Sequence, residues 1–138
     1  MTEITRSVEI DASVDEVWSQ IQPGNWPQLF STVKKVDGFT TSPGVGTHAA
    51  VMAGSSGISY NIEITEFIEK TKIAYRRYGG PLSGKGVIEL RPLQSGTVLT
   101  RTGFYDDSLA EETIKSICDG IEQDNLRIKK TVENSKNV

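Results

Sequence analysis

The sequence predicts an α+β domain in which a curved antiparallel sheet wraps around a long C-terminal helix, with two short helices after the first strand. Three observations predict this class. One alternating strand is followed at once by two short amphipathic segments, strand-like segments separated by turn residues fill the middle of the chain, and a proline-free helical pattern closes it. These elements bury all of their apolar faces when the sheet curls around the last helix.

Length and charge restrict the class of protein further. The chain has 138 residues, 36% of them hydrophobic, and we expect one domain over residues 1–138 whose last residues, 134–138, form a frayed tail. The net charge of −3 argues against nucleic acid as a partner, because nucleic acid requires a concentrated basic face. No apolar run approaches the ~20 residues that span a bilayer, and the amino terminus lacks the pattern of a secretion signal, so we expect a cytoplasmic protein without membrane insertion.

The first strand and the first helix have clear local signals. Apolar and polar residues mostly alternate over Ile4–Ile10, which predicts a strand with one buried face. The sequence Ser13-Val14-Asp15-Glu16 then matches a capping box, in which the serine side chain accepts the Glu16 amide hydrogen and the glutamate reaches back. Apolar residues at i, i+3, i+4 and i+7 share one face of this helix, which ends at Pro23-Gly24: Val14, Val17, Trp18 and Ile21.

A second short helix and then a strand meander are expected. Pro27 suits the first turn of a helix from Trp26 to about Val33, with Leu29 and Phe30 on its apolar side. After Val36, strand-like segments alternate with turn residues at 42–44, 54–57, 69–71, 79–81 and 94–96. The clearest strand of this antiparallel meander runs over Ile58–Ile64.

The last predicted element is one long helix from Leu109 to about Val132. Apolar residues recur along it at helical spacing, with no proline: Ile114, Ile117, Cys118, Ile121, Ile128 and Val132. Cys118 is the only cysteine, so it forms no internal disulfide, and we interpret it as a small buried apolar residue.

The geometry of the last hairpin predicts which side chains of its strands face inward. Residues directly opposite each other in an antiparallel pair share a face of the sheet. A loop over Leu93–Gly96 places Ile88 opposite Arg101 and Leu90 opposite Leu99. Arg101 is therefore expected on an otherwise aliphatic face.

An earlier hairpin gives a similar result. A two-residue loop at Lys70-Thr71 would place Ile68 opposite Ile73 and Ile64 opposite Arg77. Isoleucines, tyrosines and Arg77 then line up on one face. The alternative is that Arg77 and Arg101 lie on the outer face, where nearby glutamates would pair with them: Glu63, Glu66 and Glu89.

The inward face supplies the candidate ligand-binding residues. It combines aliphatic side chains with arginine guanidinium and tyrosine hydroxyl groups, as a site for a small apolar ligand with a polar group requires. The candidates are Tyr60, Ile62, Ile64, Tyr75, Arg77, Ile88, Leu90, Leu99, Arg101, Tyr105, Ile117 and Ile121. No catalytic residue is assigned.

Two other features are interpreted as having no cofactor or metal role. The segment Gly79–Gly86 imitates a phosphate-binding loop, but Gly86 stands where serine or threonine would bind magnesium, and strand-like sequence follows in place of a helix. His48, the only histidine, has no cysteine or carboxylate at metal-ligand spacing, so we favour a structural or surface role for it. We therefore expect no cofactor and no protein-bound metal.

Several short motifs, in their order, resemble the START-like superfamily, also called SRPBCC. The resemblance lies in Val8–Ser13 running into Val17-Trp18, in Trp26, in Gly96-Thr97 before the last strand, and in Lys130–Glu133 near the end of the last helix. This superfamily includes the birch-pollen allergen, polyketide cyclase and dehydratase proteins, and lipid-transfer domains. The resemblance covers nearly the whole chain and implies the helix-grip fold.

The resemblance and the expected inward face lead to three functional hypotheses. The first is binding or transport of a small hydrophobic ligand (a lipid, isoprenoid, sterol-like or aromatic, polyketide-like compound) in an internal cavity. The second is a polyketide cyclase or dehydratase in which Tyr60, Tyr75, Tyr105 and Arg101 orient the chain and stabilise an enolate. The third is a chaperone-assisting module, which would expose an apolar patch in place of a closed cavity.

Overall fold

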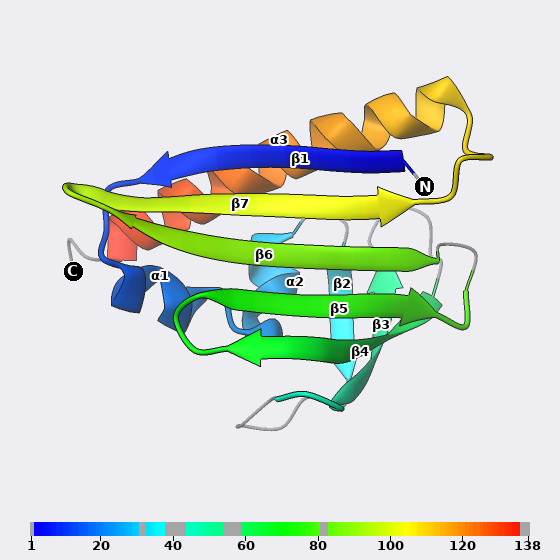
Figure 1. The fold of residues 1–138 in the computed structure, drawn as a ribbon, viewed down its shortest axis with the longest axis horizontal. Coiled ribbons are helices and arrows are strands. Elements are labelled where there is room, and N and C mark those ends of the chain that lie inside the picture. Colours follow the sequence, from blue (N-terminus) through cyan, green and yellow to red (C-terminus); the bar gives the residue numbers. More distant parts are fainter. Residues whose placement is uncertain (1, 31–32, 38–43, 54–58, 81–82, 136–138) are drawn as a thin grey trace.

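A long helix and two short helical segments lie against one face of a curved antiparallel sheet. The computed structural model describes residues 2–30, 33–37, 44–53, 59–80 and 83–135 (Figure 1). Its elements are β1 (Thr2–Ile10), α1 (Val14–Gln20), a 3-10 turn η1 (Pro23–Asn25), α2 (Trp26–Leu29), β2 (Val33–Asp37), β3 (His48–Ala53), β4 (Ser59–Ile68), β5 (Lys72–Tyr78), β6 (Gly84–Leu93), β7 (Gly96–Tyr105) and α3 (Glu111–Ser135).

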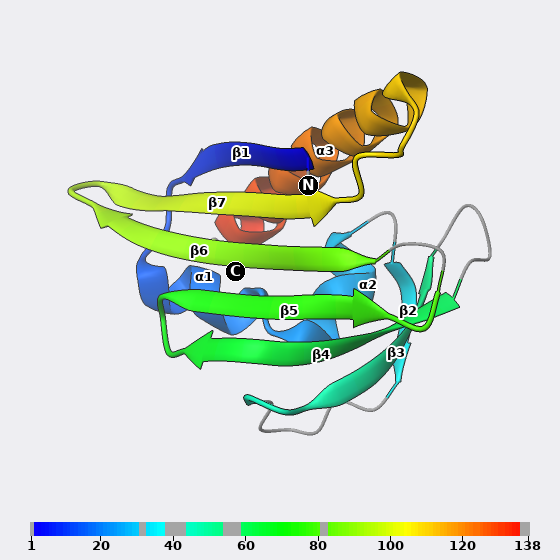
Figure 2. The same cartoon turned by 45° about the vertical axis from the view of Figure 1, so that its right-hand side comes forward.

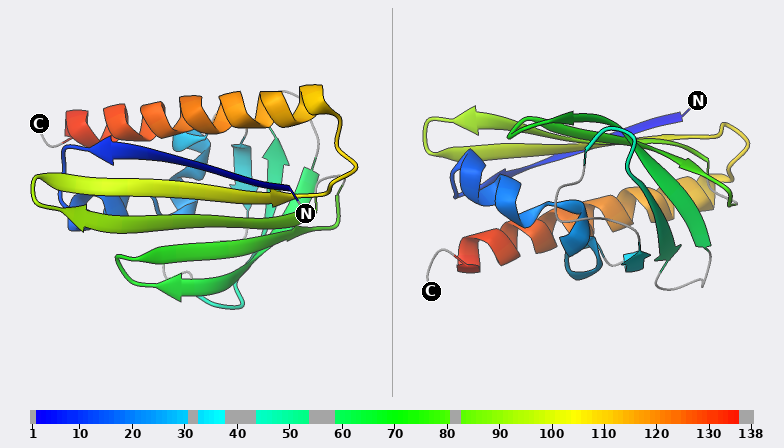
Figure 3. Two further views of the ribbon diagram at one scale, coloured as in Figure 1. Left: turned by 45° about the horizontal axis from the view of Figure 1, so that its top comes forward. Right: turned by 90° about the horizontal axis from the view of Figure 1, so that it is seen from below.

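The sheet has the order β1-β7-β6-β5-β4-β3-β2, with every neighbouring pair antiparallel. The β2–β3 end of the sheet bends away from the plane of the other strands (Figure 2). Seen from below, α1, α2 and α3 all lie on the concave side (Figure 3). The predicted α+β helix-grip architecture is therefore confirmed.

The first helix forms as its sequence predicts. The Ser13 side chain accepts a hydrogen bond from the Glu16 amide at 3.2 Å, and the Glu16 carboxylate accepts one from the Ser13 amide at 3.3 Å, which completes the capping box. Val17 and Ile21 are fully buried below the sheet. Capping and burial of one face together explain why this short segment is helical.

The second helix is shorter than predicted. It ends at Leu29, because Phe30 already has extended backbone angles (φ −109°, ψ 117°), and Val33 begins strand β2. Val33 pairs with Ala53 of β3, so a strand ladder replaces the helical turn that the apolar spacing suggested.

The predicted register of the last hairpin is confirmed. Ile88 lies opposite Arg101, and Leu90 lies opposite Leu99, across a two-residue turn at Gln94-Ser95. These side chains point to the concave face, as the hairpin geometry required.

The predicted register of the β4–β5 hairpin is wrong in detail. The loop has three residues, with Lys70 in the left-handed region (φ 62°), and a bulge interrupts the pairing between Ile64 and Glu66. Arg77 therefore lies opposite Ile62 rather than Ile64. Between the bulge and the loop, Phe67 turns inward onto the Trp18 ring (centroids 5.3 Å apart) while Ile68 is 49% exposed.

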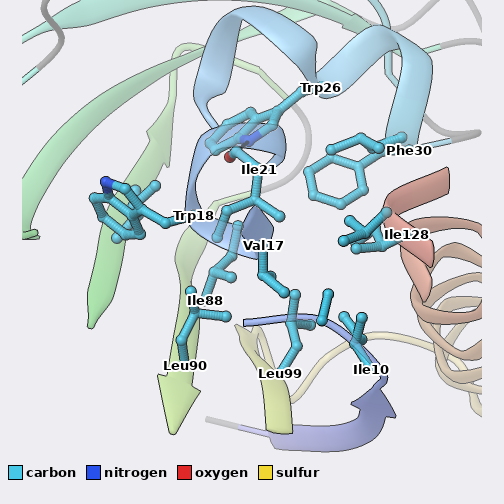
Figure 4. Close-up of a cluster of buried hydrophobic side chains, with 14 of the residues drawn as sticks. Ile10, Val17, Trp18, Ile21, Trp26, Phe30, Ile88, Leu90, Leu99 and Ile128 are labelled. Atoms are coloured by element: carbon cyan, nitrogen blue, oxygen red, sulfur yellow. Dashed lines mark hydrogen bonds between the residues drawn. The ribbon is translucent and has the colours of Figure 1, made fainter. Parts of the chain in front are cut away.

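Two apolar clusters form the core. The larger one joins α1, α2 and the second half of α3 to the sheet (Figure 4). The smaller one contains Ile4, Tyr105 and Ile121, with Ile114, Ile117 and Cys118 partly buried against it. Cys118 is thus a partly buried apolar residue, less enclosed than predicted.

The long helix α3 begins at Glu111 and continues through Asn134 and Ser135, which the sequence analysis placed in a frayed tail. The Ser135 hydroxyl donates to the Val132 carbonyl at 2.8 Å. Among the other predictions, Ile58 and the turn residues 42–43, 54–57 and 81 lie outside the described residues.

Candidate functional site

The concave face of the sheet holds the candidate ligand-binding residues of the strands. The inward side chains of β4 to β7 are buried or partly buried: Tyr60, Ile62, Ile64, Tyr75, Arg77, Ile88, Leu90, Leu99, Arg101 and Tyr105. The error in the β4–β5 register leaves this face intact, because the extra loop residue and the bulge residue each shift the pairing by one and together preserve the alternation. Ile117 and Ile121 contribute from α3.

Polar side chains gather between the two apolar clusters. Tyr75 packs against the larger cluster, whereas Tyr105 belongs to the smaller one. The Arg77 guanidinium carbon lies over the Tyr105 ring, and the rings of Tyr75 and Tyr105 cover two directly paired glycines of β6 and β7. Tyr60 and Arg101 occupy inward positions of the same sheet face. We call these five residues the tyrosine–arginine cluster.

Arg77 is 8% exposed and sits inside the fold rather than on its outer face. Its Nη2 donates to the carbonyl of Phe104 at 2.9 Å and to that of Lys85 at 3.2 Å. The guanidinium carbon lies 4.7 Å from the centre of the Tyr105 ring. Its Nε is buried and has no hydrogen-bond partner in the described part of the chain. The guanidinium therefore keeps one donor for an acceptor that the described residues do not supply.

Arg101 also points inward, and α3 provides its counter-ion. Its Nη1 lies 3.5 Å from a carboxylate oxygen of Asp124, which is 2% exposed. The two groups form an ion pair, and Nη1 is a second buried donor without a hydrogen-bond partner among the described residues. The guanidinium carbon stacks 4.3 Å from the centre of the Phe30 ring.

Each of the three tyrosines in the cluster carries a hydroxyl group that can donate a hydrogen bond. Burial is the main cause that raises the pKa of Tyr60 to about 12, and the neighbouring Tyr75 adds to it. Burial likewise raises the pKa of Tyr105. No hydrogen bond to another described residue is formed by the hydroxyls of Tyr60, Tyr75 or Tyr105. A ligand that accepts hydrogen bonds would satisfy them.

Asp124 and Asn125 are polar residues of this region that the sequence analysis missed. Both are buried on α3, and the Asn125 side-chain amide donates to the Arg6 carbonyl at 3.3 Å while its Oδ1 stays without a partner among the described residues. Helical spacing in the sequence could have identified both residues as part of the buried face. The two residues stand three and four positions after Ile121, so they continue the buried stripe.

The first half of α3 is less buried than the second. Ile114 and Ile117 are partly exposed, whereas Ile128 and Val132 are fully buried. Among the other elements, α3 packs most extensively against β1, at the edge of the sheet. The tyrosine–arginine cluster thus lies toward the end of the fold where the helix is packed less tightly.

The remaining candidates lie elsewhere. His48 is on the outer face, where its Nδ1 is hydrogen-bonded to the Tyr78 hydroxyl at 2.7 Å and its side chain is 52% exposed. The imitation of a phosphate-binding loop leads into strand β6, which begins at Gly84, so no helix presents its amides there. Two open grooves of about 560 and 570 Å³ lie outside the concave face and share only Leu90 with the candidate residues.

The described part of the chain contains neither a metal-binding cluster nor a membrane-spanning helix. No group of three or more histidine, cysteine, aspartate or glutamate side chains in this part of the chain is arranged to hold a metal ion. No helix among these residues is long and apolar enough to cross a membrane.

Comparison with protein families gives a match along nearly the whole chain. A family model described as "Polyketide cyclase / dehydrase and lipid transport" matches residues 1–133. Among curated proteins, an uncharacterized 17.2 kDa protein of Streptomyces lincolnensis, from the melC2-rnhH intergenic region, is 25% identical over 115 residues, which cover 81% of this chain and 75% of that protein.

Solved structures show the same fold at low sequence identity. The di-domain ARO/CYC BexL from the BE-7585A biosynthetic pathway superposes with a TM-score of 0.79 and 18% identity, covering 100% of this chain and 48% of that chain. Ara h 8.0201 superposes with a TM-score of 0.74 and 14% identity, covering 95% of this chain and 97% of that one.

Proposed function

This chain belongs to the polyketide cyclase/dehydrase and lipid transport family, part of a superfamily that binds hydrophobic ligands, and on that premise we propose that it binds a small amphipathic molecule between the concave sheet face and α3. The hydrocarbon part of the ligand contacts the aliphatic wall that includes Ile62, Ile64 and Ile88. The polar part, a carboxylate, enolate, phenol or carbonyl, meets the tyrosine–arginine cluster.

One observation carries this proposal: a buried donor without an acceptor. Arg77 Nε is buried without a hydrogen-bond partner among the described residues. Arg101 Nη1 forms no hydrogen bond with a described residue either, although it lies within ion-pair distance of Asp124. A buried, unsatisfied donor costs about 1–3 kcal/mol, and a guanidinium does not lose its charge at ordinary pH. An acidic or strongly accepting ligand group would remove that cost, which favours a ligand with such a group over a pure hydrocarbon.

A cyclase or dehydratase is the second candidate. The similarity to BexL favours it, as does a cluster that joins positive charge to neutral phenol donors able to stabilise an enolate. However, the carboxylate that reaches the cluster, Asp124, is paired with Arg101, and His48 lies on the opposite face. The described groups thus favour polarisation of a carbonyl over proton abstraction, and binding remains the better supported function.

A chaperone-assisting role has less support. The large apolar residues with high exposure come from four separate segments of the described chain: Val45, Ile68, Leu93 and Leu126. Single exposed apolar side chains are ordinary for a folded protein and do not by themselves form a docking surface.

The proposal is tested by comparing a fluorescent fatty acid, cis-parinaric acid, with its methyl ester. The two ligands have the same hydrocarbon chain, and the ester lacks the negative charge that the cluster would recognise. Replacement of Arg77 by Met should weaken binding of the acid about ten- to a hundredfold and leave the ester nearly unchanged, because one charge-assisted hydrogen bond is lost. The ratio of the two affinities is the readout, since general loss of structure lowers both.

The neighbouring arginine provides the control. Arg76 lies on the outer face, where it pairs with Glu63, so Arg76→Met should change neither affinity. Equal loss of acid and ester in Arg77→Met would exclude the polar anchor. Absence of saturable, one-to-one binding to the unaltered protein would refute the proposed function itself.

A further inference from the structure

Four polar side chains form a connected group on the outer face of the sheet, opposite the proposed ligand site. His48 of β3, Glu63 of β4 and Arg76 of β5 occupy directly paired positions, so they stand in one row across three strands. Tyr78 comes two residues after Arg76 on β5 and shares its face. Because hydrogen-bonded strands hold all four backbones, the sheet fixes where these side chains begin, as a precise site requires.

The Tyr78 hydroxyl is hydrogen-bonded to a histidine that a carboxylate supports. Tyr78 Oη lies 2.7 Å from Nδ1 of His48, and Nε2 of the same ring lies 3.7 Å from a carboxylate oxygen of Glu63. In the tautomer that carries its proton on Nε2, the imidazole accepts from the hydroxyl at Nδ1 and turns its N–H toward the carboxylate. A nucleophile, a base and a group that orients the base are the arrangement used in nucleophilic catalysis.

Arg76 contacts two members of this group. Its Nε donates a hydrogen bond to the Glu63 carboxylate, and its guanidinium carbon lies 4.4 Å from the centre of the Tyr78 ring. The first contact holds the carboxylate beside the histidine. The second places a positive charge over a ring that gains negative charge as its hydroxyl loses a proton, so Arg76 favours the reactive form of Tyr78.

Asn61 adds a hydrogen-bond donor beside Tyr78. The two residues are directly paired, so their side chains share the outer face. A methyl group at Gly79, the residue after Tyr78, would stand 2.7 Å from Nδ2 of Asn61, which places this amide nitrogen next to the tyrosine. No described residue accepts a hydrogen bond from that nitrogen. A side-chain amide in such a position can donate to the oxyanion that forms during acyl transfer.

We propose that this outer face carries an acyl-transfer site, at which Tyr78 accepts an acyl group from an activated carboxylic ester. Tyr78 Oη attacks the carbonyl carbon of the ester while its proton passes to Nδ1 of His48. A bond then joins Oη to the acyl carbon, the bond from that carbon to the leaving oxygen breaks, and His48 gives the proton to that oxygen. The products are the tyrosine ester and a free alcohol. This activity is independent of the proposed function, whose residues lie on the concave face.

The test uses p-nitrophenyl acetate as the acyl donor. Mass spectrometry of the peptide that contains Tyr78 gives the rate of its acetylation, and hydroxylamine, which cleaves esters, separates acetyl-tyrosine from acetyl-lysine. His48→Ala should lower this rate by about tenfold or more, less than the 10²–10⁴-fold typical of general bases, because the histidine side chain is 52% exposed. Tyr78→Phe should abolish the hydroxylamine-sensitive label on this peptide.

The pH dependence of the same rate separates a tyrosine assisted by a base from an ordinary exposed one. A reaction that needs a neutral imidazole rises between about pH 5.5 and 7.5 and then levels off. An unassisted tyrosine reacts through its phenolate and gains rate steadily toward about pH 10. The unaltered protein should show the first profile and His48→Ala the second.

Glu66 provides a matched control for the supporting carboxylate. It lies on the same strand as Glu63 and pairs with Lys72 at 3.3 Å, away from the tyrosine. Glu63→Gln should lower the acetylation rate of Tyr78, whereas Glu66→Gln should leave it unchanged, and circular dichroism reports folding of each variant. Equal rates in the unaltered protein and His48→Ala, a rate that rises steadily to about pH 10, or no acetylation of Tyr78 at all would each overturn the proposal.

Discussion

Arg101 and Asp124 form a buried ion pair that links the sheet to α3. The arginine side chain is 13% exposed and that of the aspartate 3%. Such a pair adds little net stability, because the cost of removing two charges from water offsets most of their attraction. Removing one partner is nevertheless costly, because the other charge stays buried without its counter-ion. The pair therefore fixes the position of α3 relative to β7 more than it strengthens the fold.

Arg101→Met should lower the free energy of unfolding by about 3 kcal/mol, the lower end of the range for a buried pair. Asp124→Leu should cost a similar amount, and the double variant should cost clearly less than the sum of the two, which urea unfolding would measure. Arg6 makes a matched but exposed pair with Glu122 of α3, so Arg6→Met should cost less than about 1 kcal/mol. Additive losses in the double variant would contradict the coupling.

The Tyr60 hydroxyl makes stability depend on pH in the alkaline range. Burial raises its pKa from 10.0 to about 12, so above pH 10 the unfolded chain loses this proton while the folded chain holds it. The stabilisation due to the buried Tyr60 hydroxyl is fully present below pH 10.0 and is lost as the pH rises toward 12, by up to about 2–3 kcal/mol. After correction for any constant offset, the free energies of unfolding of the unaltered protein and of Tyr60→Phe should coincide below about pH 10. Above about pH 10 the unaltered protein should lose stability relative to Tyr60→Phe. Parallel curves up to about pH 12 would show that Tyr60 is not buried.

At the scale of elements, the β4–β5 hairpin shows how two local irregularities preserve one face. The loop is one residue longer than expected and the bulge adds one residue to β4. Each change alone would turn Tyr60 and Ile62 to the outer face, since side chains alternate with a period of two. Together they keep these residues inside and bring Phe67 onto Trp18.

The two halves of α3 should differ in their protection from hydrogen exchange. The amides of 121–132 should exchange slowly because Ile121, Ile128 and Val132 anchor that half, whereas those of 114–120 belong to residues that are partly or fully exposed. A ligand bound beside Ile117 should slow the first half selectively. Mass spectrometry of exchange with and without cis-parinaric acid measures this effect. Uniform slowing along the helix would indicate global stabilisation in place of contact with this half.

At the scale of the whole molecule, the sheet and the helices enclose an interior that is not uniformly apolar. The main cluster holds α1, α2 and the end of α3 together, and the smaller cluster holds the opposite end of α3. The tyrosine–arginine cluster lies between them. A molecule built in this way has its stability concentrated at one end and its buried polar groups near the other, which is where a ligand would complete the packing.

The sequence by itself determined the elements whose signals are local. The capping box at Ser13 and Glu16, the alternation of the strands and the helical spacing of α3 each arise from interactions within a few residues, and all were confirmed. The register of the last hairpin was also predictable, because its short turn allows few alternatives. The strand alternation and the hairpin turns predicted that Arg77 and Arg101 face inward, with an outward orientation as the alternative.

Only the tertiary structure decided what surrounds those arginines. The bulge between Ile64 and Glu66 has no sequence signal of its own, and the early end of α2 reflects pairing of Val33 with a distant strand. Asp124 meets Arg101, and the tyrosine rings cover Gly86 and Gly103, only after α3 and the strands are assembled. Contacts between residues far apart in the chain depend on the summed packing of all elements, whereas a local pattern encodes only its own segment.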